Sequence, residues 1–372
     1  MKKRITYIVS GINKSVFFEQ TAILLKENGI DLSFILINST GGMLDNFLQA
    51  NHFNIRRLTV KRIYRSFWAI LKCRRHLKEL DPDIIHCHLT SANTVGLIAG
   101  FMAGIKNRIY TRHAGQLLHG SKKERLLDFL HNSLAKKIVA ITINVKEILL
   151  SQGVAENKIA LIHHGFDIKR MMHPDAEELT RIKNSYNMGK QYPVIGVVAR
   201  WLEWKGIQYV IPAFKKLLLK YPAARLCLFN GDETTAYGME IKKMLAGINP
   251  ENYITPSFEY NVYDLFLLFD FYVHVPVNKT CEAFGQTYIE ALAAGIPSIF
   301  TLSGVATEFI TDQENALVVD YEDTNAVYDS LIELIQNKEK QQHLKENGKL
   351  SVVNNFSLET YVEKLKALYM QY

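Results

Sequence analysis

Short runs of β-branched and aromatic residues alternate with segments of helical periodicity along most of this 372-residue chain. In the first half these runs occupy residues 4–10, 31–38, 83–88, 107–113, 136–142 and 158–165. Between the first two runs, residues 15–27 have the spacing of an amphipathic helix and stop at Asn28-Gly29, as helices commonly do. A repeated strand–helix–strand order requires right-handed crossovers, so the pattern predicts a parallel α/β sheet.

The alternation weakens over residues 168–190, where Asp, Asn, Pro and Met cluster, and we place an interdomain linker there. It resumes with expected strands at residues 193–200, 224–232, 271–277, 296–301 and 315–321. The chain length also favours two domains over one. We therefore expect two doubly wound α/β domains, residues 1–170 and 171–355, and a final amphipathic segment, residues 356–372. In such sheets ligands bind at the carboxyl ends of the strands.

The net charge of +7 is distributed unevenly along the chain. Residues 1–175 contain 26 Lys and Arg against 13 Asp and Glu, whereas residues 176–372 contain 18 against 24. A basic half attracts anions such as nucleic acid, anionic lipid or a phosphorylated substrate.

A basic stretch, residues 56–80, contains apolar residues at helical spacing, and we expect a helix over residues 65–80. Its large apolar side chains, among them Phe67 and Trp68, belong by default to a buried face. The many Lys and Arg leave two interpretations open. They form a surface for anionic lipid or a lipid-diphosphate acceptor, to which residues 121–125 add, or they form a merely solvated face.

Several features indicate the compartment of the protein. The cysteines Cys73, Cys87, Cys227 and Cys281 are far apart in the sequence, as expected in a reducing cytoplasm. Residues 1–4 lead directly into an apolar run that resembles a first strand and not a signal peptide. No apolar run approaches the roughly 20 residues that a membrane-spanning helix needs.

Two cations follow the expected strand 193–199, namely Arg200 and Lys205. They suit a diphosphate, because Arg offers a planar fork of donors and Lys a point charge. Solvated surface charges are the alternative for this stretch alone. Asn230-Gly231-Asp232 follows another strand, where the glycine leaves room for a flat base or a phosphate.

The stretch CEAFGQTYIEALAAGIP, residues 281–297, carries two glutamates around a predicted helix start at Gln286. The first amides of a helix bind phosphate well, and Gly285 permits a close approach to the backbone. Glu290 lies about 6–8 Å along the helix at 1.5 Å per residue. Carboxylates accept hydrogen bonds from vicinal hydroxyls, so Glu290 and Glu282 could each hold a sugar. An exposed helical residue is the alternative for Glu290, although its helix is otherwise apolar.

Two further patterns imitate metal sites. Asp81-Pro82-Asp83 has the D-x-D spacing, but its proline favours a turn. His86 and His88 share one face of a strand, yet no further ligands complete a zinc site, which favours core histidines. No G-x-G-x-x-G follows the first strand, which argues against a dinucleotide-dependent dehydrogenase.

The order of Arg200, Lys205-Gly206, Glu282-x-Phe284-Gly285 and Glu290 resembles retaining glycosyltransferase family 4. The resemblance implies the GT-B fold, in which two Rossmann-like domains face each other across a cleft and the last helix returns to the first domain. The turn IHHGFD, residues 162–167, also resembles the family pattern, with His164 where Asn is usual. The segment 303–308, with Glu308, cannot be aligned with a family motif.

The resemblance also implies roles for the site residues. Arg200 and Lys205 would neutralise the donor diphosphate, Glu282 would contact the donor sugar, and Glu290 would bind the ribose. The remaining expected contacts to the donor come from Gly11, His113, Gly231, Phe284, Gly285, Gln286 and Thr287. His113 would act on the sugar from the first domain. Gly11 would lie beside the phosphates, although Ile12 replaces the second glycine that is usual in the family.

The sequence therefore predicts a retaining, hexosyltransferase-type enzyme that moves a sugar from a nucleotide-diphosphate sugar to a hydroxyl. The acceptor would be a glycan, a lipid-linked or another molecule, in cell-surface polysaccharide or glycolipid synthesis. We expect no metal, no cofactor and no nucleic acid, and a location in the cytoplasm or on the inner face of its membrane. The alternatives are a nucleotide-sugar epimerase of GT-B fold and a non-catalytic basic protein that binds membrane or nucleic acid.

Overall fold

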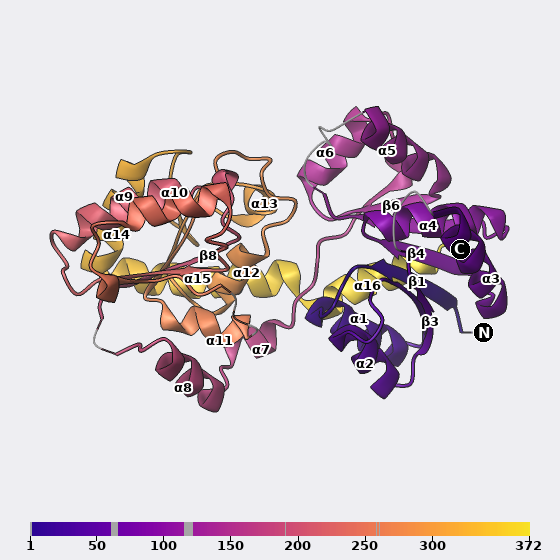
Figure 1. Cartoon of the computed structure of the whole chain (residues 1–372), viewed down its shortest axis with the longest axis horizontal. Coiled ribbons are helices and arrows are strands. Elements are labelled where there is room, and N and C mark those ends of the chain that lie inside the picture. The colour runs from indigo at the N-terminus through magenta and orange to yellow at the C-terminus, as the bar shows by residue number, and fades with distance from the viewer. Residues whose placement is uncertain (1, 61–65, 115–121, 190, 258, 260) are drawn as a thin grey trace. The chain divides into compact units, whose positions relative to one another are not determined.

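The computed structural model describes residues 2–60, 66–114, 122–189, 191–257, 259 and 261–372 (Figure 1). The chain divides into two compact units. The first unit consists of Met1–Phe166 and Leu358–Tyr372, and the second of Asp167–Ser357. The sequence had suggested divisions at residues 170 and 355.

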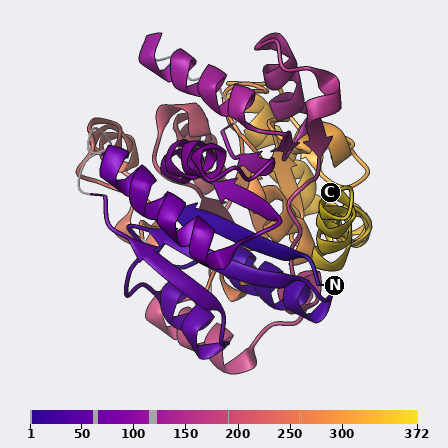
Figure 2. The ribbon, with the colours of Figure 1, turned by 90° about the vertical axis from the view of Figure 1, so that its right-hand side faces the viewer.

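The first unit is built on a seven-stranded parallel sheet in the order β3-β2-β1-β4-β5-β6-β7. Its strands are β1 (Arg4–Ser10), β2 (Asp31–Ile37), β3 (Asn54–Leu58), β4 (Ile84–His88), β5 (Asn107–Arg112), β6 (Lys137–Ala140) and β7 (Ile159–Leu161). Its helices are α1 (Val16–Glu27), α2 (Met43–Ala50), α3 (Ser66–Leu80), α4 (Thr90–Met102), α5 (Lys122–Leu134), α6 (Ile143–Ser151) and α16 (Leu358–Tyr369). Figure 2 shows these helices covering the sheet of this unit on both faces.

Local sequence signals fix the helices of the first unit. Ser15 caps α1 by accepting a hydrogen bond from the amide of Phe18 at 3.4 Å, and Gly29 follows its end with a φ of +81°. On one face of the sheet, α1, α2 and α16 enclose a core around Tyr7 and Phe34. On the other face α4 packs closely, because a Cβ on Gly96 would come within 2.6 Å of the Cys87 sulfur.

The histidines of β4 are core residues, as predicted. His86 Nδ1 lies 2.6 Å from the Tyr369 hydroxyl, and His86 Nε2 lies 2.8 Å from the Thr111 hydroxyl. Tyr369 also shares a 2.7 Å hydrogen bond with Tyr7, so α16 is bonded to the first and fourth strands of this unit. Asp81 lies in a turn at a φ of +44° and pairs with Arg4.

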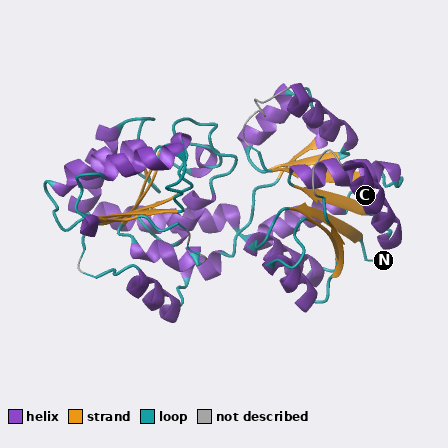
Figure 3. Ribbon diagram, in the orientation of Figure 1, coloured by secondary structure: helices purple, strands orange, loops and turns teal. Residues whose placement is uncertain are grey.

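The second unit has a six-stranded parallel sheet in the order β10-β9-β8-β11-β12-β13. Its strands are β8 (Val194–Val198), β9 (Arg225–Phe229), β10 (Tyr253–Ile254), β11 (Phe271–His274), β12 (Ser298–Phe300) and β13 (Leu317–Val318). Its helices are α7 (Ile168–Met172), α8 (Ala176–Ser185), α9 (Ile207–Leu218), α10 (Ala236–Leu245), α11 (Val262–Leu265), α12 (Gln286–Ala293), α13 (Ala306–Phe309), α14 (Thr324–Gln336) and α15 (Lys338–Phe356). Figure 3 shows the strands of each unit as a layer between helices. The prediction of two doubly wound α/β domains is confirmed.

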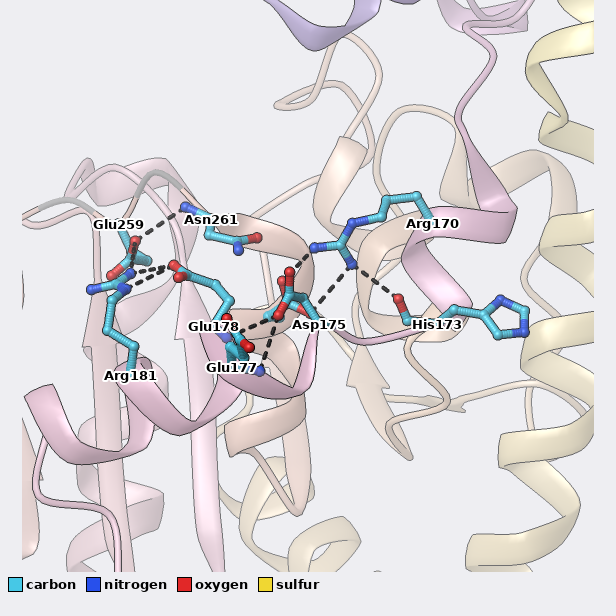
Figure 4. Close-up of polar contacts among 9 residues, drawn as sticks. Arg170, His173, Asp175, Glu177, Glu178, Arg181, Glu259 and Asn261 are labelled. Carbon is cyan, nitrogen blue, oxygen red and sulfur yellow. Dashed lines mark hydrogen bonds and ion pairs between the residues drawn. The ribbon is translucent and has the colours of Figure 1, made fainter.

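The predicted linker over residues 168–190 is wrong for most of its length, because α7 and α8 occupy it. Both helices are anchored to the second unit by ion pairs (Figure 4). Arg170 pairs with the buried carboxylate of Asp264 at 2.6 Å, and Asp264 also accepts the amide of Asp175 at 2.8 Å. Arg181 reaches Glu259 at 3.2 Å. Polar helices held by partners distant in sequence look like a linker when read residue by residue.

The basic stretch, residues 56–80, is not a single element. Its first residues belong to β3, an edge strand that the sequence prediction missed, and residues 61–65 lie outside the described part. In α3, Ile70 and Leu77 are buried as expected. Phe67 and Trp68 are not part of that buried face, since they are 62% and 75% exposed. No helix in the described part of the chain is both long and apolar enough to cross a membrane.

Candidate active site

The carboxyl ends of β8 and β11 bring a cation and a carboxylate together in the second unit. The loop after β8 ends in a turn of 3-10 helix, Glu203–Lys205, and the loop after β11 carries Glu282. Lys205 Nζ donates a hydrogen bond to Glu282 Oε1, and both side chains are largely buried. Glycine at position 206 allows the two loops to pack closely, because any Cβ there would overlap the carbonyl oxygen of Val275. Its φ of +77° also favours glycine.

His274, the last residue of β11, completes this pair. Its Nε2 lies 3.0 Å from Glu282 Oε1, while its Nδ1 is buried and has no hydrogen-bond partner among the described residues. Burial alone would raise the pKa of Glu282, but the hydrogen bond from His274 and the charge of Lys205 outweigh it and lower the pKa to about 2. Glu282 is therefore an ionised acceptor at neutral pH.

The segment after β12 supports the loop that carries Glu282. The backbone amide of Glu282 donates to Ser303 Oγ at 3.0 Å, and Val305 donates its amide to the carbonyl of Phe284 at 2.9 Å. A Cβ on Gly304 would lie 2.7 Å from that carbonyl and 2.8 Å from the Glu282 Cβ. This is the segment that the sequence could not assign; Glu308, in α13, is only partly buried.

The helix that follows, α12, begins at the predicted residue. Its N-cap is Gly285, at a φ of +90°, and no side chain caps the helix. A Cβ on Gly285 would lie 2.6 Å from the Tyr288 ring, so glycine is needed in this turn. The amides of Gln286 and Thr287 form the uncapped positive end of the helix dipole, and such an end suits a phosphate.

Glu290 lies on the buried side of α12 and is only 5% exposed, so the alternative of a solvated helical residue is wrong. Gln286 Nε2 donates to its Oε1 at 2.6 Å. Burial raises the pKa of Glu290 to about 7, although the hydrogen bond from Gln286 opposes the rise. A buried carboxyl with a pKa near neutrality and one donor partner is suited to receive further hydroxyl donors.

Three residues predicted to contact the donor, Arg200, Gly231 and Phe284, lie differently from these. Arg200 follows β8 at the same edge of the sheet, but its side chain is exposed, and the ion pairs of Glu282 are with Lys205 and His274 and not with Arg200. Gly231 follows β9, and the side from which a Cβ would project is filled by the indole of Trp201. The glycine therefore accommodates that buried ring, and Phe284 is likewise a buried residue packed against Phe356.

In the first unit, Gly11 and His113 follow β1 and β5 at the carboxyl edge of the sheet. Gly11 has a φ of +67° and donates its amide to the carbonyl of Ile37 at 2.9 Å. His113 stacks on His164 at 5.3 Å between ring centroids, and its Nε2 lies 3.4 Å from His88 Nδ1. Burial lowers the pKa of His113 to about 4, so the ring is neutral at neutral pH.

A pocket of about 350 Å³ lies beside His113 in the first unit. Its wall contains a buried ion pair in which Arg112 Nη1 lies 3.0 Å from Asp128 Oδ2. Asn93 Oδ1 and Arg112 Nε are buried without a hydrogen-bond partner among the described residues. Burial lowers the pKa of His131, another wall residue, to about 4. The pocket thus has a mostly apolar lining with a few polar groups, and the charges of Arg112 and Asp128 in its wall balance each other.

His274 and Ser303 are site residues that sequence reasoning missed. His274 lies inside an apolar strand, and the only signal for it was a polar residue at the carboxyl end of that strand, eight residues before Glu282. Among the described residues, no three His, Cys, Asp or Glu side chains could hold a metal ion together. A reaction without a metal stays a prediction.

Two sequence families match the chain. Residues 179–351 match the model of "Glycosyl transferases group 1". Residues 15–170 match that of "Glycosyltransferase Family 4". The two matches follow each other along the chain and together cover most of both units.

Individual proteins extend these matches. The capsular polysaccharide biosynthesis glycosyltransferase CapM of Staphylococcus aureus is 25% identical over 82% of this chain and 81% of its own length. The alpha-monoglucosyldiacylglycerol synthase of Acholeplasma laidlawii is 23% identical over 82% and 80%. The crystal structure of Anabaena Alr3699/HepE in complex with UDP and glucose superposes with a TM-score of 0.83 at 17% identity and covers both chains completely.

Proposed function

Because the chain belongs to glycosyltransferase family 4 and is therefore a sugar-transferring enzyme of GT-B fold, we propose that the second unit binds a nucleotide-diphosphate sugar. The bound sugar is passed to an acceptor hydroxyl with retention of its anomeric configuration. The acceptor is a glycan or a lipid-linked molecule of cell-surface polysaccharide or glycolipid synthesis. The observation that carries this proposal is the buried Lys205–Glu282–His274 group beside the uncapped start of α12.

This group can hold the diphosphate and the sugar at once. An ammonium group has three donors, so Lys205 can keep its bond to Glu282 and still donate to a phosphate. The amides at the start of α12 add two neutral donors and the positive end of the helix dipole. All of these N–H groups are held in place before the nucleotide sugar binds, so they stabilise the charge that develops on the leaving diphosphate. Arg200 is exposed and free to turn toward the same phosphates.

The pKa of Glu282 separates binding from proton transfer. A carboxylate with a pKa of about 2 accepts hydrogen bonds but is a poor base at neutral pH. We therefore assign Glu282 to the donor sugar, where it accepts hydrogen bonds from hydroxyls. In the transfer step the acceptor oxygen bonds to the anomeric carbon while the bond from that carbon to the phosphate oxygen breaks. The acceptor proton passes to the leaving phosphate on the same face.

The first-unit pocket beside His113 suits an acceptor sugar. Thr90, Asn93 and His113 line it and carry hydrogen-bonding groups that can meet sugar hydroxyls. The Arg112–Asp128 pair and the neutral histidines leave no net charge to attract an ion. Replacing Asn93 by leucine should raise KM for the acceptor and leave KM for the donor unchanged, because only the acceptor would lose a hydrogen bond.

Named relatives guide the choice of substrates. UDP and glucose are bound in the superposed Anabaena structure, so a UDP-hexose is the first donor to test. The names of two relatives refer to capsular polysaccharide and to a glucosyldiacylglycerol, which directs the acceptor search to surface glycans and glycolipids. The alternatives, an epimerase or a non-catalytic binding protein, find no support in the comparisons.

We further propose that α3 contacts an anionic bilayer. Phe67 and Trp68 are exposed at its start, and exposed Lys72 and Arg75 follow on the same helix. Exposed aromatic rings next to cations are typical of peripheral membrane surfaces. Vesicles containing phosphatidylglycerol should sediment the native protein, and Trp68→Ser should weaken the binding severalfold. Leu219→Ser, which removes an equally exposed apolar side chain from the second unit, should not.

The donor site is tested by transfer of radiolabelled sugar from UDP-, GDP- and ADP-sugars to extracted glycans and glycolipids. Lys205→Ala and Glu282→Ala should each abolish transfer, and circular dichroism checks that the variants are folded. Lys215→Ala, which removes an exposed cation from α9, is the matched control and should remain active. Full activity of either site variant would refute the assignment. A new nucleotide sugar formed without acceptor would instead favour the epimerase.

A further inference from the structure

A second pocket lies at the opposite edge of the first sheet from His113. It has a volume of about 440 Å³ and is lined by five cations, Lys106, Arg108, Lys136, Lys137 and Lys158. These residues lie at or just before the first residues of β5, β6 and β7, and thus at the amino ends of the strands. His113 follows the carboxyl end of β5. The pocket is therefore separate from the expected acceptor site, and it is built from first-unit residues, whereas the expected donor site is built from second-unit residues.

None of these five cations forms an ion pair with an acidic side chain in the described part of the chain. Two acids near these strand ends, Glu156 and Asp83, are occupied by other cations. Glu156, in the turn that contains Lys158, pairs with Lys146 at 2.7 Å. Asp83, just before β4, accepts the amide of Arg4 at 2.9 Å and pairs with its guanidinium. The pocket thus concentrates positive charge that the protein itself does not neutralise.

Backbone carbonyls hold three of the cations at the pocket wall. Lys158 Nζ donates to the carbonyl of Asn132 at 2.6 Å, and Lys137 Nζ donates to that of Asn157 at 2.6 Å. Arg108 Nε donates to the carbonyl of Leu134 at 2.8 Å, and its guanidinium lies over the ring of Phe101 at 5.5 Å. These bonds fix the cations in place before any ligand arrives, which lowers the entropy lost on binding.

The arrangement differs from a surface that serves only solubility. Such a surface leaves its ammonium groups in water, whereas Arg108 and Lys158 are half-buried and close enough to repel each other. Burial, and then the charges of Arg108 and Lys136, lower the pKa of Lys158. An anion bound among the cations offsets both their mutual repulsion and the cost of burying their charge.

We propose that this pocket binds a doubly charged phosphate group, a phosphomonoester or a diphosphate, at a site separate from the donor site. Phosphate supplies several acceptor oxygens for the Lys and Arg donors in a volume that this pocket accommodates. The group can belong to a soluble molecule or to the headgroup of a lipid. Both sources present the same chemistry to the pocket.

The first test is calorimetric titration of the full-length protein with inorganic pyrophosphate in 0.15 M NaCl. Lys205→Ala serves as the parent, so that the donor site does not contribute. Lys106→Gln combined with Lys136→Gln removes two exposed cations of the pocket. Neither is among the three that donate to backbone carbonyls, so folding should be preserved. Their loss should weaken binding at least about tenfold, because hydrogen bonds to charged groups are strong. The control, Lys183→Gln with Lys243→Gln, removes the same charge from exposed positions of the second unit.

The second test uses phosphatidylcholine vesicles with and without phosphatidic acid, whose headgroup is a phosphomonoester. Pyrophosphate binding that depends on Lys106 and Lys136 supports a site for soluble phosphates. Vesicle binding that depends on them, without pyrophosphate binding, supports the same site for a lipid headgroup. The proposal is overturned if the parent binds neither probe, or if the pocket variant and the control variant bind both probes equally well.

Discussion

Binding of a nucleotide sugar should release a proton from Glu290. Burial raises the pKa of this carboxyl to about 7 in the free protein, so it is mostly protonated at pH 6. A ribose that donates hydrogen bonds to both oxygens favours the carboxylate and returns the pKa toward its ordinary value of 4.5. The proton must then leave as the donor binds.

The magnitude follows from these two pKa values. At pH 6.0 about 0.9 proton should be released per donor bound, and at pH 8.0 only about 0.1. The affinity for the donor should consequently increase about fivefold from pH 6 to pH 7, and less than about twofold from pH 7 to pH 8. The buried histidines His113 and His131 do not interfere, since burial lowers the pKa of each to about 4.

Calorimetric titration in buffers of different ionisation enthalpy measures the released protons directly. UDP-glucose suits the assay, because it lacks the terminal phosphate that would itself titrate near pH 6. Glu290→Gln is the control, and its proton release at pH 6 should fall to nearly zero. The reasoning is refuted if the native protein releases no proton at pH 6, or if Glu290→Gln releases as many.

Three further predictions concern stability and the structure of the two units. Since folding raises the pKa of Glu290 from 4.5 to about 7, stability from this carboxyl is present below pH 4.5 and lost as the pH rises through 7. Glu290→Gln should thus raise the free energy of unfolding at pH 8 by up to about 3 kcal/mol but hardly at pH 4; urea titrations giving equal differences at both pH values would contradict this. Gly304→Ala should destabilise the protein by about 1–3 kcal/mol and weaken donor binding, because the new Cβ would collide with the loop that carries Glu282 and the backbone φ of +57° is strained for alanine. Gly189→Ala is the control and should have neither effect, because no atom lies within 4 Å of a Cβ built there. Tyr369→Phe should cost about 1–3 kcal/mol by breaking the buried bonds to Tyr7 and His86, and unchanged denaturation would show that α16 is held by apolar packing alone.

Much of the fold could be predicted because buried parallel strands are short continuous apolar runs. The runs at residues 4–10 and 31–38 correspond to β1 and β2 nearly residue for residue. The edge strands β3 and β10 were not predicted, since β3 contains Arg56 and Arg57 and β10 has only two residues. The helices at residues 168–185 were not predicted for another reason. Their stability depends on ion pairs such as Arg170–Asp264, which join residues far apart in sequence.

Sequence spacing alone was enough to predict that Lys205, Glu282 and the start of α12 lie at one edge of a sheet, because all three follow strands. It could not show that Glu282 shares one oxygen between Lys205 and His274, since that depends on side-chain packing. Nor could it show that Trp201 fills the space beside Gly231. The sequence indicates which loops meet, whereas the pKa values of Glu282 and Glu290 arise only from burial in the folded unit.

In the proposed mode of donor binding, the Lys205–Glu282 pair and the start of α12 hold the diphosphate. A crystal structure of the protein grown with UDP-glucose tests it most directly. We predict phosphate oxygens within about 3 Å of Lys205 Nζ and of an amide at Gln286 or Thr287, with the ribose on Glu290. A diphosphate bound elsewhere, with this edge of the second unit empty, would contradict the account.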